Sequence, residues 1–411
     1  MSKDKPEIRF AGYTDAWEKH KFSEGMAEYT DRVMIQDDKD YPQLSVSNKG
    51  KLSLRGITNG KKIGRKRQAK INLKKHPNTL VFTRQTVEQG GIGLAPNAVD
   101  GAIVTENMPT IDVDTNVWNI YYLTAFFNTS QYYKNALLSN IEGGSAQVAI
   151  HEDKWLESEF SAAEFNEQNQ IGTLFSTLNN LIVVNQRKVD LLKELKKGFL
   201  QKMFPKNGED KPEIRFGGYT DAWEKRKLGE IGETHSGIGF PENEQGGKKG
   251  IPFFKVSDMN NFGNEHEMNV ANNYVNDDQL ERKKWKVINN VPGIIFAKVG
   301  AAIMLNRKRL IKVPFLMDNN TMEYAFDRSW NVYFGKTLFE TLNLPKYAQV
   351  GALPSYNGSD IETISVEIPE KDEQERIGTF FQRLDQLITV NQRRVDLLKQ
   401  EKKALLQKMF V

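Results

Sequence analysis

Two stretches of the chain show the apolar spacing of long amphipathic helices. In residues 167–204 the steps between seam positions alternate between four and three residues, and residues 373–410 repeat the pattern. Such steps place apolar side chains along one side of a helix, as in a coiled coil. The seam positions are Ile171, Phe175, Leu178, Ile182, Val189, Leu192, Phe199 and Met203 in the first stretch and Ile377, Phe381, Leu384, Ile388, Val395, Leu398, Leu405 and Met409 in the second.

Polar residues mark the expected ends of both helices. Asn166 and Asp372 are predicted to be the N-caps, and Glu375 follows Asp372 at the spacing of a capping box. Pro205 is expected to end the first helix directly after Phe204, because proline cannot continue a helix.

Each seam is interrupted at the same two places, by Asn185 and Lys196 in the first helix and by Asn391 and Lys402 in the second. A buried Asn at a seam position costs stability but fixes the helix register and the choice of partner. Asn185 and Asn391 lie near the middle of their helices, so either a parallel or an antiparallel pair would let them hydrogen-bond across the seam. We predict an antiparallel coiled coil, which relates the halves of the chain by a pseudo-twofold axis.

The two helices belong to a repeated frame. Residues 4–21 recur at 210–227 with 16 of 18 positions identical, and the helical stretches share 25 of 38 positions, both at an offset of 206 residues. The segments between them, 22–166 and 228–372, are each 145 residues long and show no similarity by eye. A long-period repeat fixes the architecture. The chain is therefore predicted to hold two unlike inserts in a duplicated frame, with both inserts doing versions of the same job.

The inserts are predicted to be mixed α/β domains. Short buried strands are expected at Thr79–Phe82 and Ala102–Thr105 in the first insert, and at Ile251–Val256 and Gly293–Ala297 in the second. Glycine and lysine meet in the loop at 246–250, where a flexible backbone can approach phosphates closely.

Composition places the chain among ordinary globular proteins. Of its 411 residues, 39% are hydrophobic and 27% are charged. It contains no cysteine, which excludes a disulfide framework and thiolate metal sites. It shows neither a long apolar run nor a signal peptide, so no membrane association and a cytoplasmic location are expected.

The basic residues are concentrated in two patches. Lys49–Lys75 contains 11 Lys or Arg and no Asp or Glu, and Glu281–Lys312 contains nine basic residues and one acidic residue. Charge runs are often only solvated surface. One patch in each insert favours a polyanion such as nucleic acid as the partner.

Polar residues after the predicted strands are candidates for reaching base edges in a DNA groove. Arginine suits guanine, and Asn or Gln suits adenine. The candidates are Arg84, Gln85, Lys255, Ser257, Asp258, Asn260 and Lys298.

The motifs of common catalytic sites are missing. No glycine-rich loop has the spacing of a nucleotide site. The pairs His151-Glu152 and His266-Glu267 begin like a zinc-hydrolase motif, but Trp155 and Val270 occupy the positions of its second histidine. No nuclease or amino-methyltransferase motif is found. The chain is predicted to recognise a target without chemistry of its own.

The whole pattern resembles the specificity subunits of type I restriction–modification enzymes, the HsdS family. The resemblance covers the whole chain, with two variable domains alternating with two repeated helices. Its local motifs are Glu167-Gln168 with Ile171-Gly172, Glu373-Gln374 with Ile377-Gly378, the segment from Ser236-Gly237 through Gly250–Asp258, and Pro292–Gly300. The first insert lacks the Ser-Gly…Pro opening.

The resemblance implies that each variable domain reads one half of a bipartite double-stranded DNA target. The paired helices would set the gap and dock two methyltransferase subunits, and two restriction/translocase subunits would join for cleavage. S-adenosylmethionine, ATP and Mg are expected on those partners, with no cofactor, metal site or catalytic residue in this chain. A helix of 38 residues spans about 57 Å, which matches one to two turns of DNA.

The predicted domains are 1–165 and 206–371 for recognition, with spacer helices at 166–205 and 372–411. Residues expected to contact phosphate are Lys61, Lys62, Arg65, Lys66, Arg67, Lys248, Lys249, Lys283, Lys284, Arg307, Lys308 and Arg309. Arg84, Gln85, Lys255, Ser257 and Lys298 are expected to read or support bases, Asn185 and Asn391 to set the helix register, and Arg187, Lys188, Arg393 and Arg394 to dock partners. The alternatives are a coiled-coil adaptor without DNA specificity and a self-acting DNA enzyme.

Overall fold

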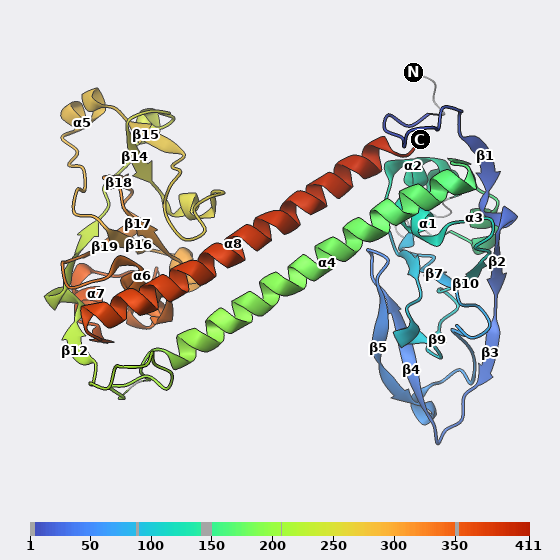
Figure 1. Cartoon of the computed structure of the whole chain (residues 1–411), viewed down its shortest axis with the longest axis horizontal. Coiled ribbons are helices and arrows are strands. Elements are labelled where there is room, and N and C mark those ends of the chain that lie inside the picture. The colour runs from blue at the N-terminus through green and yellow to red at the C-terminus, as the bar shows by residue number, and fades with distance from the viewer. Residues whose placement is uncertain (1–4, 88–89, 141–149, 207, 350–352) are drawn as a thin grey trace. The chain divides into compact units, whose positions relative to one another are not determined.

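The computed structural model describes residues 5–87, 90–140, 150–206, 208–349 and 353–411. The chain forms two compact units: unit 1 contains Met1–Gln186 and Arg393–Val411, and unit 2 contains Arg187–Gln392. Each unit holds one insert and one half of each long helix (Figure 1). Among the described residues, no helix is long and apolar enough to cross a membrane.

The long helices are α4, Phe165–Lys202, and α8, Lys371–Lys408, of 38 residues each. Both begin earlier than the sequence suggested, since the N–H of Gln168 already donates to the Glu164 carbonyl at 2.9 Å. Asn166 and Asp372 therefore lie inside the first turn, and their prediction as N-caps is wrong. The helix α4 also ends before Phe204, so Pro205 does not directly terminate it.

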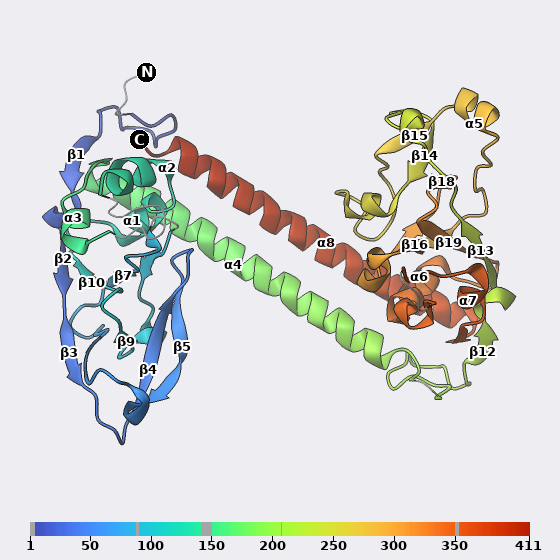
Figure 2. The same cartoon turned by 180° about the vertical axis from the view of Figure 1, so that it is seen from behind.

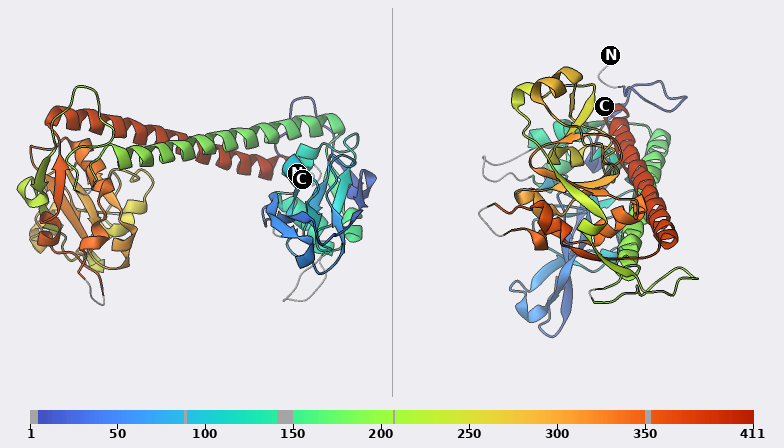
Figure 3. Two further views of the ribbon diagram at one scale, coloured as in Figure 1. Left: turned by 90° about the horizontal axis from the view of Figure 1, so that it is seen from below. Right: turned by 90° about the vertical axis from the view of Figure 1, so that its left-hand side faces the viewer.

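The seam positions of both helices are buried or half-buried, as predicted. In unit 1 the rings of Phe175, near the start of α4, and Phe410, just beyond α8, lie 5.9 Å apart. In unit 2 the rings of Phe381 and Phe204 lie 6.1 Å apart. The second pair is the first one displaced by 206 residues, with the roles of the helices exchanged. Within each unit the helix halves thus run antiparallel, as Figure 3 shows.

The repeated segment before each insert is tied to the start of a long helix. In unit 1, Arg9 donates through Nε and Nη2 to the two carboxylate oxygens of Glu167 at 2.8 and 2.7 Å. Trp17 Nε1 donates to the same carboxylate at 3.0 Å. In unit 2, Arg215 and Glu373 repeat the two-pronged bond at 2.7 and 2.8 Å. The Glu of the repeated Glu-Gln motif is thus a buried anchor for each domain.

The Gln and Gly of the repeated motif hold the first α-helix of the first insert. Gln168 accepts from the backbone N–H of Asn119 at 3.1 Å and donates to the Ala163 carbonyl at 2.9 Å. A Cβ on Gly172 would lie 2.3 Å from the Asn119 side-chain oxygen, so glycine is required for this approach. That oxygen caps the following helix, α1, by accepting from Tyr121 and Tyr122.

The described residues of unit 1 form three sheets: β1-β11, β2-β10-β7-β8 and β3-β6-β9-β4-β5. The predicted strands at Thr79–Phe82 and Ala102–Thr105 are present as β7 and β9. The element bounds are β1 Glu18–Lys21, β2 Met26–Tyr29, β3 Asp31–Met34, β4 Asp40–Val46, β5 Leu52–Asn59, β6 Arg67–Lys70, β7 Leu80–Phe82, β8 Ile92–Leu94, β9 Ile103–Val104, β10 Thr110–Val113, β11 Glu159–Ala162, α1 Ile120–Phe126, α2 Ser130–Tyr132 and α3 Glu152–Leu156.

Three sheets also form within the described part of unit 2: β12-β20, β13-β19-β16-β17 and β15-β14-β18. Figure 2 shows β14, β15 and β18 grouped beneath α5 and next to the sheet that holds β16 and β19. The bounds are β12 Glu224–Lys227, β13 Gly232–Ser236, β14 Ile251–Phe254, β15 Asn273–Val275, β16 Gly293–Ala297, β17 Lys308–Ile311, β18 Leu316–Met317, β19 Thr321–Phe326, β20 Ser365–Ile368, α5 Asp277–Lys283, α6 Val332–Thr341 and α7 Gly358–Glu362. The predicted strand Gly293–Ala297 matches β16, whereas the strand from Ile251 ends at Phe254.

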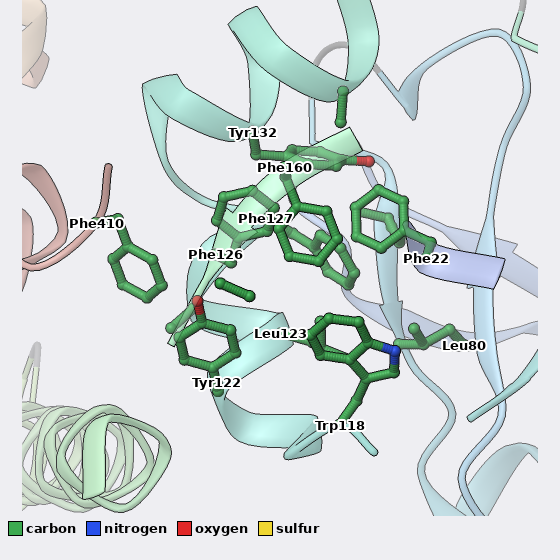
Figure 4. Packing of buried hydrophobic residues seen from close by; sticks show 14 of the residues in the cluster. Phe22, Leu80, Trp118, Tyr122, Leu123, Phe126, Phe127, Tyr132, Phe160 and Phe410 are labelled. Atoms are coloured by element: carbon green, nitrogen blue, oxygen red, sulfur yellow. The ribbon is translucent and has the colours of Figure 1, made fainter. Parts of the chain in front are cut away.

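The main core of unit 1 is rich in aromatic side chains (Figure 4). Phe22 stacks on Trp155 and on Phe160, with ring centroids 4.4 Å apart in both pairs. Phe410 lies 5.3 Å from Tyr122 of α1, so the end of α8 closes the core. This packing fixes the insert on the helix pair, because buried aromatic rings contribute both large apolar area and specific ring geometry.

Candidate nucleic-acid interface

The basic residues predicted to contact phosphate in unit 1 gather around one turn and the strand after it. Lys61 and Lys62 lie exposed in a short 3-10 turn, Gly60–Lys62. Arg67 is exposed at the start of β6. Arg65 pairs with Glu106, and Lys66 with Asp37 at 2.5 Å, in exposed positions where water weakens ion pairs. All five basic side chains therefore lie on or near the surface of the domain.

The residues predicted to read bases in unit 1 differ in their surroundings. Arg84 donates through Nε and Nη2 to both carboxylate oxygens of Glu152, with the Nε contact at 2.7 Å. The hydrogen bonds that Arg84 donates to Glu152 raise the pKa of Arg84. This guanidinium is thus engaged within the domain and does not fit the role of a free base reader. Gln85 is exposed.

In unit 2, part of the predicted set lies exposed around β14 and α5. Lys248 and Lys249 lie exposed in the loop before β14. Lys284 is exposed in a left-handed conformation after α5, at φ 55°. Lys283 lies 3.2 Å from Glu244, a carboxylate that hydrogen bonds from Arg282 and Gln279 hold at a pKa of about 2. These lysines thus lie in the loop before β14 and at the end of α5, and one of them pairs with the Glu244 carboxylate.

The predicted base readers of unit 2 are mostly held in internal contacts. Lys255 donates to Gln245 at 2.6 Å and lies 5.3 Å above the ring of Phe240. Lys298 donates to Ser236 at 3.0 Å. Ser257 is exposed in a 3-10 segment after β14. Of these three, Ser257 is the most accessible to a ligand.

Two residues predicted to contact phosphate have structural roles. Lys308 is 9% exposed and donates to the Leu342 carbonyl at 2.6 Å. Burial lowers its pKa to about 8. Arg309 donates to the carbonyl of Asn264 at 2.6 Å, and burial lowers its pKa too. Phosphate binding does not fit these residues, because they face carbonyl groups of the fold. Arg307 contacts Asn260 at the surface.

The seam Asn residues are buried and bond along their own helices. Asn185 and Asn391 are 8% and 7% exposed. Each donates to the carbonyl four residues earlier, Leu181 or Leu387, at 2.7 Å. Their role in setting the register stays a prediction. The proposed docking residues Arg187, Lys188, Arg393 and Arg394 lie exposed on the helices.

A buried ion-pair network in unit 2 was not expected from the sequence. Lys196 lies 2.5 Å from Glu340 and 2.6 Å from Asp385, and Lys336 lies 2.7 and 2.5 Å from the same two carboxylates. Burial would raise the pKa of Asp385, but the two lysines outweigh it and hold it below its usual value. His266 completes a cluster whose possible ligand atoms lie within 4.8 Å of one another. Because the ammonium groups already occupy the carboxylates, the cluster is suited to ion pairing and not to a metal ion.

A cavity of about 310 Å³ in unit 1 brings together basic residues that are distant in sequence. Arg65, Arg67 and Arg84 line it together with Arg32 of β3. Arg32 was missed because it precedes the basic run, and only its place beside β6 reveals it. Both units thus present exposed basic groups, and unit 1 adds this cavity, so the class of protein is one with two domains whose surfaces suit nucleic acid.

Comparisons with known proteins all point to one family. Residues 220–400 match the family model "Type I restriction modification DNA specificity domain". The chain is 25% identical over 307 residues to the type I restriction enzyme MjaIX specificity subunit of Methanocaldococcus jannaschii, covering 71% of this chain and 67% of that protein. The MjaVIII specificity subunit of the same organism is 22% identical over 259 residues, or 58% of each chain.

A solved structure shows the same fold. The S subunit of a type I restriction–modification system from M. genitalium aligns over 99% of both chains with a TM-score of 0.63, at 14% identity. The resemblance stated from the sequence is confirmed: the matching family model, the two relatives and the solved structure all support a specificity subunit of a type I restriction–modification system. The predicted general function, that of a DNA sequence-specificity subunit, is confirmed as well.

Proposed function

We propose that each unit reads one half of a bipartite DNA target. The observation that carries this proposal is the contrast between frame and insert. The Arg9–Glu167 and Arg215–Glu373 anchors are equivalent, whereas the inserts differ in sequence and in one described sheet, which has five strands in unit 1 and three in unit 2. Equivalent anchors with different inserts suit two readers that do the same task on different base sequences.

The helices α4 and α8 set the gap between the two half-sites. Support comes from their length of 38 residues each without a break, since a continuous helix resists bending over such a span. The antiparallel seam within each unit and the buried Asn185 and Asn391 favour one fixed register. A change of one heptad in both helices is therefore expected to change the gap and leave both half-sites unchanged.

The chain carries no reaction of its own in this proposal and acts with partner subunits. Two methyltransferase subunits dock on the helices, where Arg187, Lys188, Arg393 and Arg394 lie exposed. Two restriction/translocase subunits join for cleavage. S-adenosylmethionine, ATP and Mg belong to those partners. A solved chain described with the assembly and conformational transition of the type I R-M system shares this fold, with a TM-score of 0.53.

A binding assay with scrambled half-sites tests the proposal. The complex of this chain with its methyltransferase partner is titrated with a duplex carrying the motif, and with duplexes in which one half is scrambled. We expect each scrambled half to weaken binding by itself, and the two losses of binding free energy to add when both halves are scrambled. Equal affinity for all duplexes at the same salt concentration would favour the coiled-coil adaptor. Methylation or cutting by the purified chain alone would favour the self-acting enzyme.

A further inference from the structure

The cavity of about 310 Å³ in unit 1 lies between two of its sheets. One wall comes from β2 and β10, which carry Glu28 and Thr110, and another from β3 and β6, which carry Arg32 and Arg67. Figures 1 and 2 show β2 and β3 following one another along one edge of the unit. The strands β3 and β6 pair directly, with Arg32 opposite Ala69 and Met34 opposite Arg67. Arg32 and Arg67 are therefore diagonal neighbours on one face of the sheet.

The four arginines that line the cavity fall into two pairs. Arg65 is bonded to Glu106, and Arg84 to Glu152. Among the described residues, the side chains of Arg32 and Arg67 have no hydrogen-bond or ion-pair partner, although both line the cavity. Two guanidinium groups thus remain available to an acceptor that enters from outside.

The cavity also offers a carboxylate that is not neutralised. Glu28 of β2 lines it, and within the described part of the chain its side chain has no hydrogen bond or ion pair, although the charge of Arg84 acts on it from nearby. Burial, followed by the nearby Glu152, raises the pKa of Glu28. A phosphate group would be repelled by this carboxylate. A ligand that presents acceptors and a donor side by side matches the lining better.

The major-groove edge of a G·C base pair has this arrangement. Guanine presents two acceptors, N7 and O6, which a guanidinium binds with two hydrogen bonds, and cytosine presents the N4 amino donor, which a carboxylate accepts. We propose that this cavity reads a G·C pair of the first half-site, with Arg32 on the guanine, Glu28 on the cytosine amino group and Arg67 beside them. This inference rests on the proposed function, and it assigns base reading in unit 1 to these three residues.

Base analogues in the first half-site test the contact atom by atom. Binding is measured with the complex of this chain and its methyltransferase partner, at fixed salt, on duplexes carrying the motif. Replacing the guanine by 7-deazaguanine removes N7, whereas inosine leaves the major-groove edge intact. We expect 7-deazaguanine to weaken wild-type binding by roughly 5- to 100-fold and inosine to have little effect. In the Arg32→Ala variant, 7-deazaguanine should cause no further loss of binding affinity.

Two further variants keep the test decisive if Arg32→Ala alters folding. Arg32→Lys retains the charge but loses the planar two-pronged geometry, so it should weaken the guanine preference while its salt dependence stays unchanged. Glu28→Gln should weaken discrimination at the same base pair only. Lys62→Ala serves as the matched control, with an equal loss on every sequence.

Three results would overturn the inference. In the first, Arg32→Ala weakens binding by one factor on all sequences, which identifies a phosphate contact. In the second, Arg32→Ala keeps full discrimination at every guanine of the first half-site. In the third, the wild-type complex itself does not discriminate between sequences, which defeats the proposed function as well.

Discussion

The guanidinium of Arg9 donates two hydrogen bonds to the carboxylate of Glu167, at 2.8 and 2.7 Å, and the side chain of Glu167 is fully buried. The pair joins the segment before the first insert to the helix after it, 158 residues later in the chain. Arg215 and Glu373 repeat it at the same separation in unit 2. Each insert is thus closed at its base by the same ion pair, whatever its own sequence.

Removing Arg9 should destabilise unit 1 strongly. Arg9→Ala leaves the Glu167 carboxylate buried with only the Trp17 donor, and breaking a buried ion pair from one side costs about 3–5 kcal/mol. Urea unfolding followed by tryptophan fluorescence measures the loss, and Arg215→Ala should do the same to unit 2. Arg226→Ala is the control, because its partners Glu224 and Glu230 lie at the surface. Equal small effects in all three variants would argue against an anchor.

The repeat makes Lys196 and Lys402 a matched pair with opposite expected effects. Lys196 bridges two buried carboxylates, so Lys196→Met leaves them with one lysine, Lys336, and should cost about 3–5 kcal/mol. The position equivalent to Asp385 in unit 1 is Asn179, and burial lowers the pKa of Lys402.

Lys402→Met should accordingly leave stability unchanged or raise it. Thermal unfolding of the two variants side by side gives the comparison. Losses of similar size would mean that Lys402 has an anionic partner of its own.

Lys308 should make unit 2 less stable at neutral pH than at alkaline pH. Burial lowers its pKa from 10.5 to about 8, so the unfolded chain binds the proton more tightly than the folded one. The penalty is fully present below pH 8 and disappears as the pH rises toward 10.5. Lys308→Met should therefore stabilise the protein most near pH 7, by on the order of 3 kcal/mol at most.

The advantage of Lys308→Met should shrink as the pH approaches 10. The Leu342 carbonyl keeps a donor in the variant, because Asn306 also donates to it, at 3.1 Å. Melting temperatures between pH 7 and 10 test this, with Lys249→Met on an exposed loop as the control. A stabilisation independent of pH would show that the charge of Lys308 is not its cause.

Salt dependence of binding should separate surface lysines from interior ones. Lys62→Ala removes an exposed cation of the basic turn and should lower the slope of log K against log salt by about 0.9, since one counterion fewer is released. Lys308→Met should leave that slope unchanged. Fluorescence anisotropy with labelled duplex at several salt concentrations provides the slopes. A smaller slope for Lys308→Met would return that residue to the phosphate-binding set.

The sequence predicted the helices and their antiparallel pairing well, because the heptad spacing and the repeat act over nearly 40 positions. The N-caps were predicted wrongly from the local sequence pattern. The first helical hydrogen bonds are accepted by the carbonyls of Glu164 and Glu370, ahead of Asn166 and Asp372. The insert residues were harder to assign. Arg84 meets a partner 68 residues away, and Lys308 faces a carbonyl of a loop 34 residues away. Such long-range contacts leave no periodic trace in the sequence.

Single-molecule methylation sequencing of a chimaera tests the central claim most directly. Residues 22–166 are replaced by the corresponding insert of another specificity subunit, and the genome is sequenced in cells that supply the methyltransferase partner. We predict that one half of the methylated motif changes, while the other half and the gap remain as in the wild type. A change in both halves, or a methylated motif that does not depend on the insert, would contradict the assignment of one half-site to each unit.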